Sequence, residues 1–147
     1  RLEDTPGVTV LPTLTRSQMV REQLECQVHC YPSDPPGVGT QTHGLMQLEC
    51  AAAGAALVLS DVEAFPEIFG KAALCLPVIG KYLPDRERRV TAADYADATI
   101  TLMQNPSLWE AQSRMARQLA ERMTWESVAS NWEAMLAAIT AKEAVGV

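Results

Sequence analysis

The sequence of 147 residues has no long hydrophobic run. Its longest apolar stretch, Ala51 to Leu59, is interrupted by Gly54 and falls well short of the roughly 20 residues that cross a bilayer as a helix. The opening residues, 1–6, contain neither an initiator methionine nor the apolar segment of a signal peptide. We therefore expect no membrane-spanning segment, a cytoplasmic location, and a chain that is a fragment or has been processed.

Positive charge is also scarce, since the 12 Lys and Arg residues are outnumbered by 18 Asp and Glu residues, which gives a net charge of −6. Affinity for nucleic acids depends largely on Lys and Arg that neutralise phosphates, so we expect no nucleic-acid partner. One dense basic run, Arg-Glu-Arg-Arg at residues 86–89, lies near Lys81. It is either a solvated loop or a peripheral contact of the parent protein with anionic lipid headgroups.

The cysteines form neither a CxxC pair nor a dense disulfide framework, and we expect all of them to be reduced and buried. They are Cys26, Cys30, Cys50 and Cys75. The segment from Cys26 to Cys30 includes His29 and has the ligand types that bind zinc. A strand through Val28 would point His29 and Cys30 to opposite faces, so core packing is favoured and no metal is expected.

Nearly half of the residues, 48%, are hydrophobic, which is enough for one buried core. The hydrophobic pattern predicts an α/β fold with a Rossmann-like parallel sheet. The expected βαβαβ order is a strand at 8–12, a helix at 17–26, a strand at 26–31, a helix from Gly44 to Gly54 and a strand at 55–59. The last of these strands is apolar without alternation, which is typical of a parallel sheet covered on both faces.

After this unit, the sequence predicts a short helix at 65–69, a strand at 73–76 and three terminal helices. Thr91 with Asp94, and Ser107 with Glu110, have the spacing of capping boxes, and Thr124 opens the last helix. That helix has one apolar stripe, which consists of Val128, Trp132, Met135 and Ile139. The three tryptophans of this region, Trp109, Trp125 and Trp132, are interpreted as anchors in the core or against a neighbouring domain.

The sequence has no GxxxxGK[ST] loop and no GxGxxG after a strand, so neither of these nucleotide-binding motifs is supported. In an open α/β sheet, ligands bind beyond the carboxyl ends of the strands, which selects the loops at 32–43 and 60–64. The first loop contains Gly37-Val38-Gly39-Thr40 and leads through Thr42-His43 to a helix that begins near Gly44. The free amides and dipole of such a helix favour an anion such as a diphosphate.

Glu49 lies five residues after Gly44 and is followed by small apolar residues. Two interpretations of this carboxylate remain open. It is either a bidentate acceptor for two vicinal sugar hydroxyls or a solvent-facing helix glutamate.

The order of these motifs resembles the C-terminal donor-binding domain of the retaining GT-B glycosyltransferases that carry the E-x7-E motif. That family has Tyr-Pro-Ser, then Glu-x-Phe-Gly, Leu-Glu-Ala-Met-Ala-x-Gly, Ser-Asp and Pro-Glu-Val/Ile. The matching segments cover most of the chain and are residues 31–33 (Tyr-Pro-Ser), 41–44 (Gln-Thr-His-Gly), 48–54 (Leu-Glu-Cys-Ala-Ala-Ala-Gly), 60–61 (Ser-Asp) and 66–68 (Pro-Glu-Ile).

The resemblance implies that Glu49 holds the ribose of a nucleotide sugar, while Thr42, His43, Gly44 and Leu45 meet the diphosphate or the transferred sugar. It also implies transfer with retention, without a metal, from a donor that carries uridine diphosphate in preference to guanosine diphosphate. An acceptor sugar or lipid-linked saccharide would be bound by an acceptor domain that this chain lacks. We therefore expect residues 1–147 to be a single donor-binding domain, truncated at its N-terminus and inactive alone.

The main departure from the family is Gln41, which stands where the first glutamate of the motif is expected, eight residues before Glu49. An amide still bonds sugar hydroxyls, but it offers no negative charge to an oxocarbenium-like transition state. Three alternatives therefore stay open beside a transferase: a nucleotide-sugar epimerase relative, a non-catalytic homologue that binds sugar nucleotides or partners, and an unrelated doubly wound module.

Overall fold

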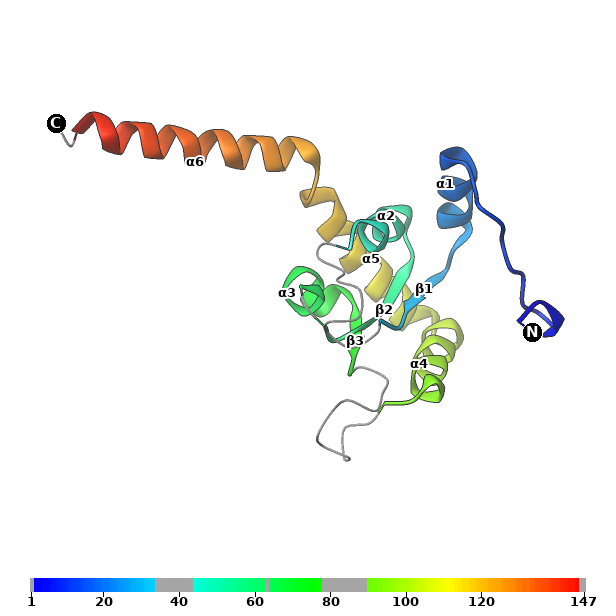
Figure 1. Ribbon diagram of the computed structural model, residues 1–147. Coiled ribbons are helices and arrows are strands. Elements are labelled where there is room, and N and C mark those ends of the chain that lie inside the picture. The colour runs from blue at the N-terminus through cyan, green and yellow to red at the C-terminus, as the bar shows by residue number, and fades with distance from the viewer. Residues whose placement is uncertain (1, 34–43, 63, 78–89, 146–147) are drawn as a thin grey trace.

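The computed structural model describes residues 2–33, 44–62, 64–77 and 90–145, with side chains up to residue 141. At its centre is a parallel sheet with the strand order β1-β2-β3 (Figure 1). The strands are β1 (Val28–Tyr31), β2 (Ala56–Ser60) and β3 (Leu74–Leu76). Val28 pairs with Ala56, and Val58 pairs with Leu74. The predicted Rossmann-like α/β class is confirmed.

Helices connect and flank these strands. In chain order they are the 3-10 helix η1 (Leu2–Asp4), α1 (Arg16–Glu25), α2 (Leu45–Ala53), α3 (Phe65–Phe69), the 3-10 helix η2 (Gly70–Ala72), α4 (Ala92–Gln104), α5 (Pro106–Arg122) and α6 (Trp125–Val145). The helices predicted at 17–26, 44–54 and 65–69 are therefore present within one residue of their expected bounds. The three terminal helices are also present, and they begin within one residue of Thr91, Ser107 and Thr124.

The central strand β2 is buried along its whole length, as its uninterrupted apolar sequence predicts. Leu57 and Leu59 belong to a core cluster with residues of α2, α3 and α5. Ala56 and Val58 belong to a second cluster on the other face, with residues of α4. Because successive side chains of a strand alternate between faces, one five-residue strand supplies both cores.

The helix ends explain where α2, α4 and α5 begin or stop. Gly54 ends α2 in the left-handed conformation with φ 99°, and Thr91 and Asp94 form the predicted capping box of α4. The prediction that Ser107 and Glu110 form a capping box is wrong. Asn105 caps α5 instead, because its side chain accepts a hydrogen bond from the amide of Leu108 while Pro106 takes the first helical position.

The prediction of a strand at residues 8–12 is also wrong. These residues form no strand, and the side chains of Val8, Val10 and Leu11 are 42%, 50% and 46% exposed. A β-branched run becomes a strand only when a neighbouring strand accepts its hydrogen bonds and a core covers one of its faces. Neither lies beside this segment in the described part of the chain.

The four cysteines are unpaired, but the expectation that all of them are buried holds only for Cys50. Cys50 is buried, Cys26 and Cys75 are partly buried, and Cys30 is exposed. Cys30 and His29 are neighbours on β1 and therefore point to opposite faces of the sheet. Within the described residues, no three metal-ligating side chains gather at one place.

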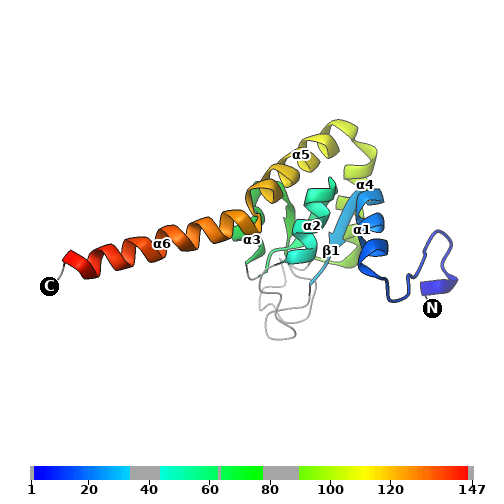
Figure 2. The same ribbon diagram turned by 90° about the horizontal axis from the view of Figure 1, so that it is seen from above.

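Helix α6 extends away from the sheet, on the side opposite the N-terminal segment, in two perpendicular views (Figures 1 and 2). Trp125 and Trp132 are 78% and 57% exposed on it, so they do not anchor the core of this chain. The other interpretation, an anchor against a neighbouring domain, stays a prediction. Trp109 on α5 does anchor a core, because it packs against the cluster that contains Val58. Among the helices that the structure describes, none combines the length and the apolar character that a bilayer crossing requires.

Candidate functional site

The carboxyl ends of the three strands are tied together by a buried hydrogen-bond network. The Ser60 hydroxyl at the end of β2 accepts a hydrogen bond from the amide of Ser33 at 2.6 Å and lies 2.8 Å from the Tyr95 hydroxyl. Tyr95 also reaches the carbonyls of Leu76 and Pro77 at 3.2 and 3.1 Å. The backbone that follows each strand is therefore held at one edge of the sheet, where a ligand of this fold class binds.

We expect Tyr95→Phe to lower the free energy of unfolding by about 1–3 kcal/mol, because it removes the buried hydroxyl that bonds Ser60 and the carbonyls after β3. Burial raises the pKa of the Tyr95 hydroxyl, so it remains a proton donor at neutral pH. Urea unfolding followed by circular dichroism measures the change. The control is Tyr31→Phe, since the Tyr31 hydroxyl has no hydrogen bond with any described residue. An equal loss in both variants would contradict a special role for the network.

Gly44 fixes the start of α2 at the same edge. Its φ of 60° is left-handed, and the first helical hydrogen bond runs from the amide of Leu48 to the Gly44 carbonyl at 3.0 Å. A Cβ on Gly44 would lie only 2.9 Å from Cε1 of Phe65, so the backbone of Gly44 lies directly against that ring. Among the described residues, no side chain caps the start of this helix. The amides of its first turn therefore point outward without a partner inside the helix.

Glu49 lies one turn further along α2, and its carboxylate is held by two side chains of α1. Arg16 binds both of its oxygens, with Nη2 2.7 Å from Oε1 and Nη1 2.9 Å from Oε2. Gln23 donates from Nε2 to Oε2 at 3.0 Å. The Glu49 side chain is 23% exposed. Glu49 is therefore not the solvent-facing helix glutamate that was one of the two interpretations of the sequence.

The hydrogen bond from Arg16 holds the pKa of the Glu49 carboxyl below its usual range, against an opposing effect of burial. Glu49 is therefore ionised at neutral pH and can accept hydrogen bonds only. The sequence interpretation missed both partners of Glu49. Arg16 and Gln23 are seven residues apart, which places them on one face of a helix, and this spacing was the only local signal that they act together.

Several residues predicted to act here lie outside the described residues. They are Gln41, Thr42 and His43, the glycine-rich segment 37–40 and Glu63 of the second loop. The basic run 86–89 with Lys81, interpreted from the sequence as a solvated loop or a lipid contact, also lies outside the described residues. Of the predicted donor-binding residues, the structure describes Gly44, Leu45 and Glu49. All three lie on or at the start of α2, with Gly44 at the carboxyl edge of the sheet and Glu49 facing α1.

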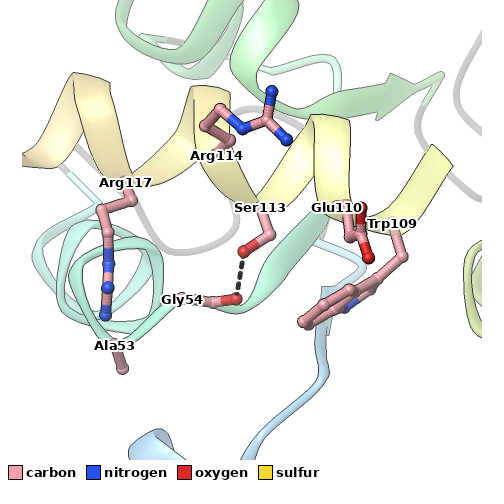
Figure 3. Close-up of a pocket in the computed structure, with 7 residues that line it drawn as sticks. All are labelled: Ala53, Gly54, Trp109, Glu110, Ser113, Arg114 and Arg117. Carbon is pink, nitrogen blue, oxygen red and sulfur yellow. Dashed lines mark hydrogen bonds between the residues drawn. The ribbon is translucent and has the colours of Figure 1, made fainter. Parts of the chain in front are cut away.

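A pocket of about 440 Å³ lies at the opposite edge of the sheet, between the end of α2 and α5 (Figure 3). Three of the side chains that line it donate hydrogen bonds to backbone carbonyls. The Ser113 hydroxyl donates to the Gly54 carbonyl at 2.6 Å, and Arg117 Nε donates to the Ala52 carbonyl at 3.2 Å. Trp109 Nε1 donates to the carbonyl of Gln27, just before β1. These contacts dock α5 at the amino ends of β1 and β2, away from the candidate site.

No family model matches this chain. It is 30% identical over 95 residues to a phosphatidyl-myo-inositol mannosyltransferase of Mycobacterium tuberculosis, and equally to the protein of that name from Mycobacterium bovis. The matched region is 65% of this chain and 24% of each relative, so the chain spans about a quarter of the length of the curated relatives it matches. Over 65% of its length, the chain is therefore similar to part of a glycosyltransferase.

Proposed function

We propose that this chain is the donor-binding part of a GT-B glycosyltransferase of the E-x7-E type, which transfers a sugar from a nucleoside diphosphate sugar with retention. The observation that carries the proposal is the amino end of α2, which opens at the carboxyl edge of the sheet with Glu49 following in the next turn. The similarity to mannosyltransferases supports the same class of reaction.

The diphosphate would bind the amides at the start of α2. A helix amino terminus presents several N–H groups and the positive end of the helix dipole to an anion. The left-handed backbone of Gly44 turns the chain into α2 at this edge, with the Phe65 ring packed where a Cβ would lie. A metal ion is not needed for this interaction, because the amides themselves supply the favourable electrostatic field.

Glu49 would accept the two vicinal hydroxyls of the ribose. An ionised carboxylate is an acceptor with two oxygens, and its hydrogen bonds are stronger than those between neutral groups. Uridine diphosphate is the proposed carrier, with guanosine diphosphate as its competitor. The neutral Gln41 would bond hydroxyls of the donor sugar. The acceptor, a sugar or lipid-linked saccharide, would be bound by another part of the full-length protein.

Titration with uridine, guanosine and adenosine diphosphates tests the donor site. We expect one of them to shift the backbone amide signals of Gly44, Leu45 and Glu49 selectively, with the same affinity in the presence of a metal chelator. In Glu49→Ala, we expect the affinity for that nucleotide to fall by about tenfold to a hundredfold, since hydrogen bonds to a charged group are lost.

Glu121→Ala serves as the control, because it removes the same charge from an exposed position on α5. Equal affinity in Glu49→Ala and in the unsubstituted chain would remove Glu49 from the site. If all three diphosphates left every amide signal unchanged, donor binding by this chain would be refuted.

A further inference from the structure

The carboxylate of Glu49 has little free capacity for a ligand. A carboxylate offers about four lone-pair positions. Arg16 and Gln23 occupy three of them, through contacts of 2.7, 2.9 and 3.0 Å. Two vicinal hydroxyls need two positions, so one of the present donors must leave before a ribose can bind as proposed.

Arg16 is the donor that leaves more easily. Its side chain is 68% exposed, so its guanidinium is rehydrated at once when the contact breaks. Gln23 is only 6% exposed between α1 and α2, and its amide would lose a partner in a place that water reaches poorly. Ion pairs with an exposed partner contribute little to stability, so their loss is easily offset by a ligand.

The location of Arg16 is fixed by the start of α1. Thr15 and Gln18 form a capping box, in which the Thr15 amide donates to Gln18 Oε1 at 2.9 Å. Arg16 is therefore the first residue of the helix, where the positive end of the dipole disfavours a cation. Glu49 compensates this unfavourable position, which explains why the guanidinium lies against that carboxylate.

We infer that Arg16 competes with the ribose diol for Glu49 and thereby weakens the binding of ribonucleotides selectively. This inference rests on the proposed donor site and adds a residue that sets its affinity. Arg16 holds the acceptor in the free protein, and the diol displaces it. A nucleotide that lacks the diol gains nothing from the displacement, so Arg16 acts only on ligands with both ribose hydroxyls.

The test compares Arg16→Gln with Arg21→Gln, a matched control that removes the same charge from another exposed position of α1. Dissociation constants are measured for uridine and guanosine diphosphates and for their 2′,3′-dideoxy analogues. We expect Arg16→Gln to bind the better ribonucleotide about 1.5-fold to fivefold more tightly, which is the range of an exposed ion pair. Its affinity for the dideoxy analogue and both affinities of Arg21→Gln should stay unchanged.

A ligand-free measurement accompanies the titration. The carboxyl carbon of Glu49, followed by NMR from neutral to acidic pH, should report a higher pKa in Arg16→Gln, because the bond that lowers it is removed. An unchanged pKa of Glu49 in Arg16→Gln would overturn the inference, whatever the nucleotide affinities are.

The nucleotide titration has its own contrary outcomes. Weaker ribonucleotide binding by Arg16→Gln would overturn the inference too, since Arg16 would then orient Glu49. If Arg16→Gln bound the dideoxy analogue more tightly by the same factor as the ribonucleotide, competition between Arg16 and the diol would be excluded. Absence of binding in every variant would refute the donor site itself.

Discussion

Replacement of Phe65 by alanine should lower the free energy of unfolding by about 3–5 kcal/mol, the usual cost of deleting a buried aromatic ring. Phe65 opens α3 and is fully buried. Its ring makes edge-to-face contacts with Tyr31 and Phe69, at centroid distances of 6.3 and 5.9 Å. It therefore joins the end of β1 to α3 at the edge of the sheet where the candidate site lies.

Urea unfolding monitored by circular dichroism measures this loss. Met103→Ala on α4 is the control, because its side chain is 58% exposed and its removal should change stability by no more than about 0.5 kcal/mol. If Phe65→Ala is too unstable to fold, Phe65→Leu retains most of the apolar volume, so its free energy of unfolding can be measured instead. A loss below about 1 kcal/mol in Phe65→Ala would contradict the packing described here.

The second large effect is expected for Gly44→Ala, which should cost about 2–4 kcal/mol. Part of this cost is the left-handed backbone, at roughly 1–2 kcal/mol for a residue with a Cβ. The remainder is the clash of that Cβ with the Phe65 ring at 2.9 Å. Because Gly44 also begins α2, we expect the amide signals of the first turn of this helix to shift in the variant.

Gly54→Ala is the matched control for the cost of placing a residue with a Cβ in the left-handed conformation. Gly54 has φ 99°, but a Cβ there would be in ordinary van der Waals contact, 3.6 Å from the Arg117 guanidinium and 3.9 Å from the Ser113 hydroxyl. Gly54→Ala should therefore cost less than Gly44→Ala. A double-mutant cycle isolates the clash, since Phe65→Leu removes the ring atom that the added methyl group would meet. If Gly44→Ala were equally costly in the unsubstituted chain and in the Phe65→Leu variant, the steric explanation would be wrong.

Local sequence was sufficient for most of the fold. The five apolar residues before Ser60 have no polar alternation, and Gly54 before them supplies the left-handed end of α2. Both signals depend only on neighbouring residues. The segment at 8–12 has the same kind of local signal, yet it forms no strand because a strand also needs a hydrogen-bonding neighbour and a covered face. Local propensity does not contain that information.

The candidate site was predictable in part, for the same reason. Gly44 and Glu49 belong to one helix and its cap, so their spacing placed them correctly relative to each other. The Arg16 guanidinium comes from 33 residues earlier in the chain and meets Glu49 only because α1 packs beside α2. The Ser60 and Tyr95 hydroxyls are 35 residues apart and meet through the packing of α4 against the sheet. Such contacts follow from the tertiary arrangement and leave no mark in a local pattern.

The projecting helix α6 has a consequence for the motion of the molecule in solution. A compact chain of 147 residues has a radius of gyration of about 15 Å. A helix of 21 residues is about 32 Å long, twice that radius. The chain therefore tumbles anisotropically, with slower rotation about the axes perpendicular to α6 than about its length, and diffuses more slowly than a sphere of equal mass.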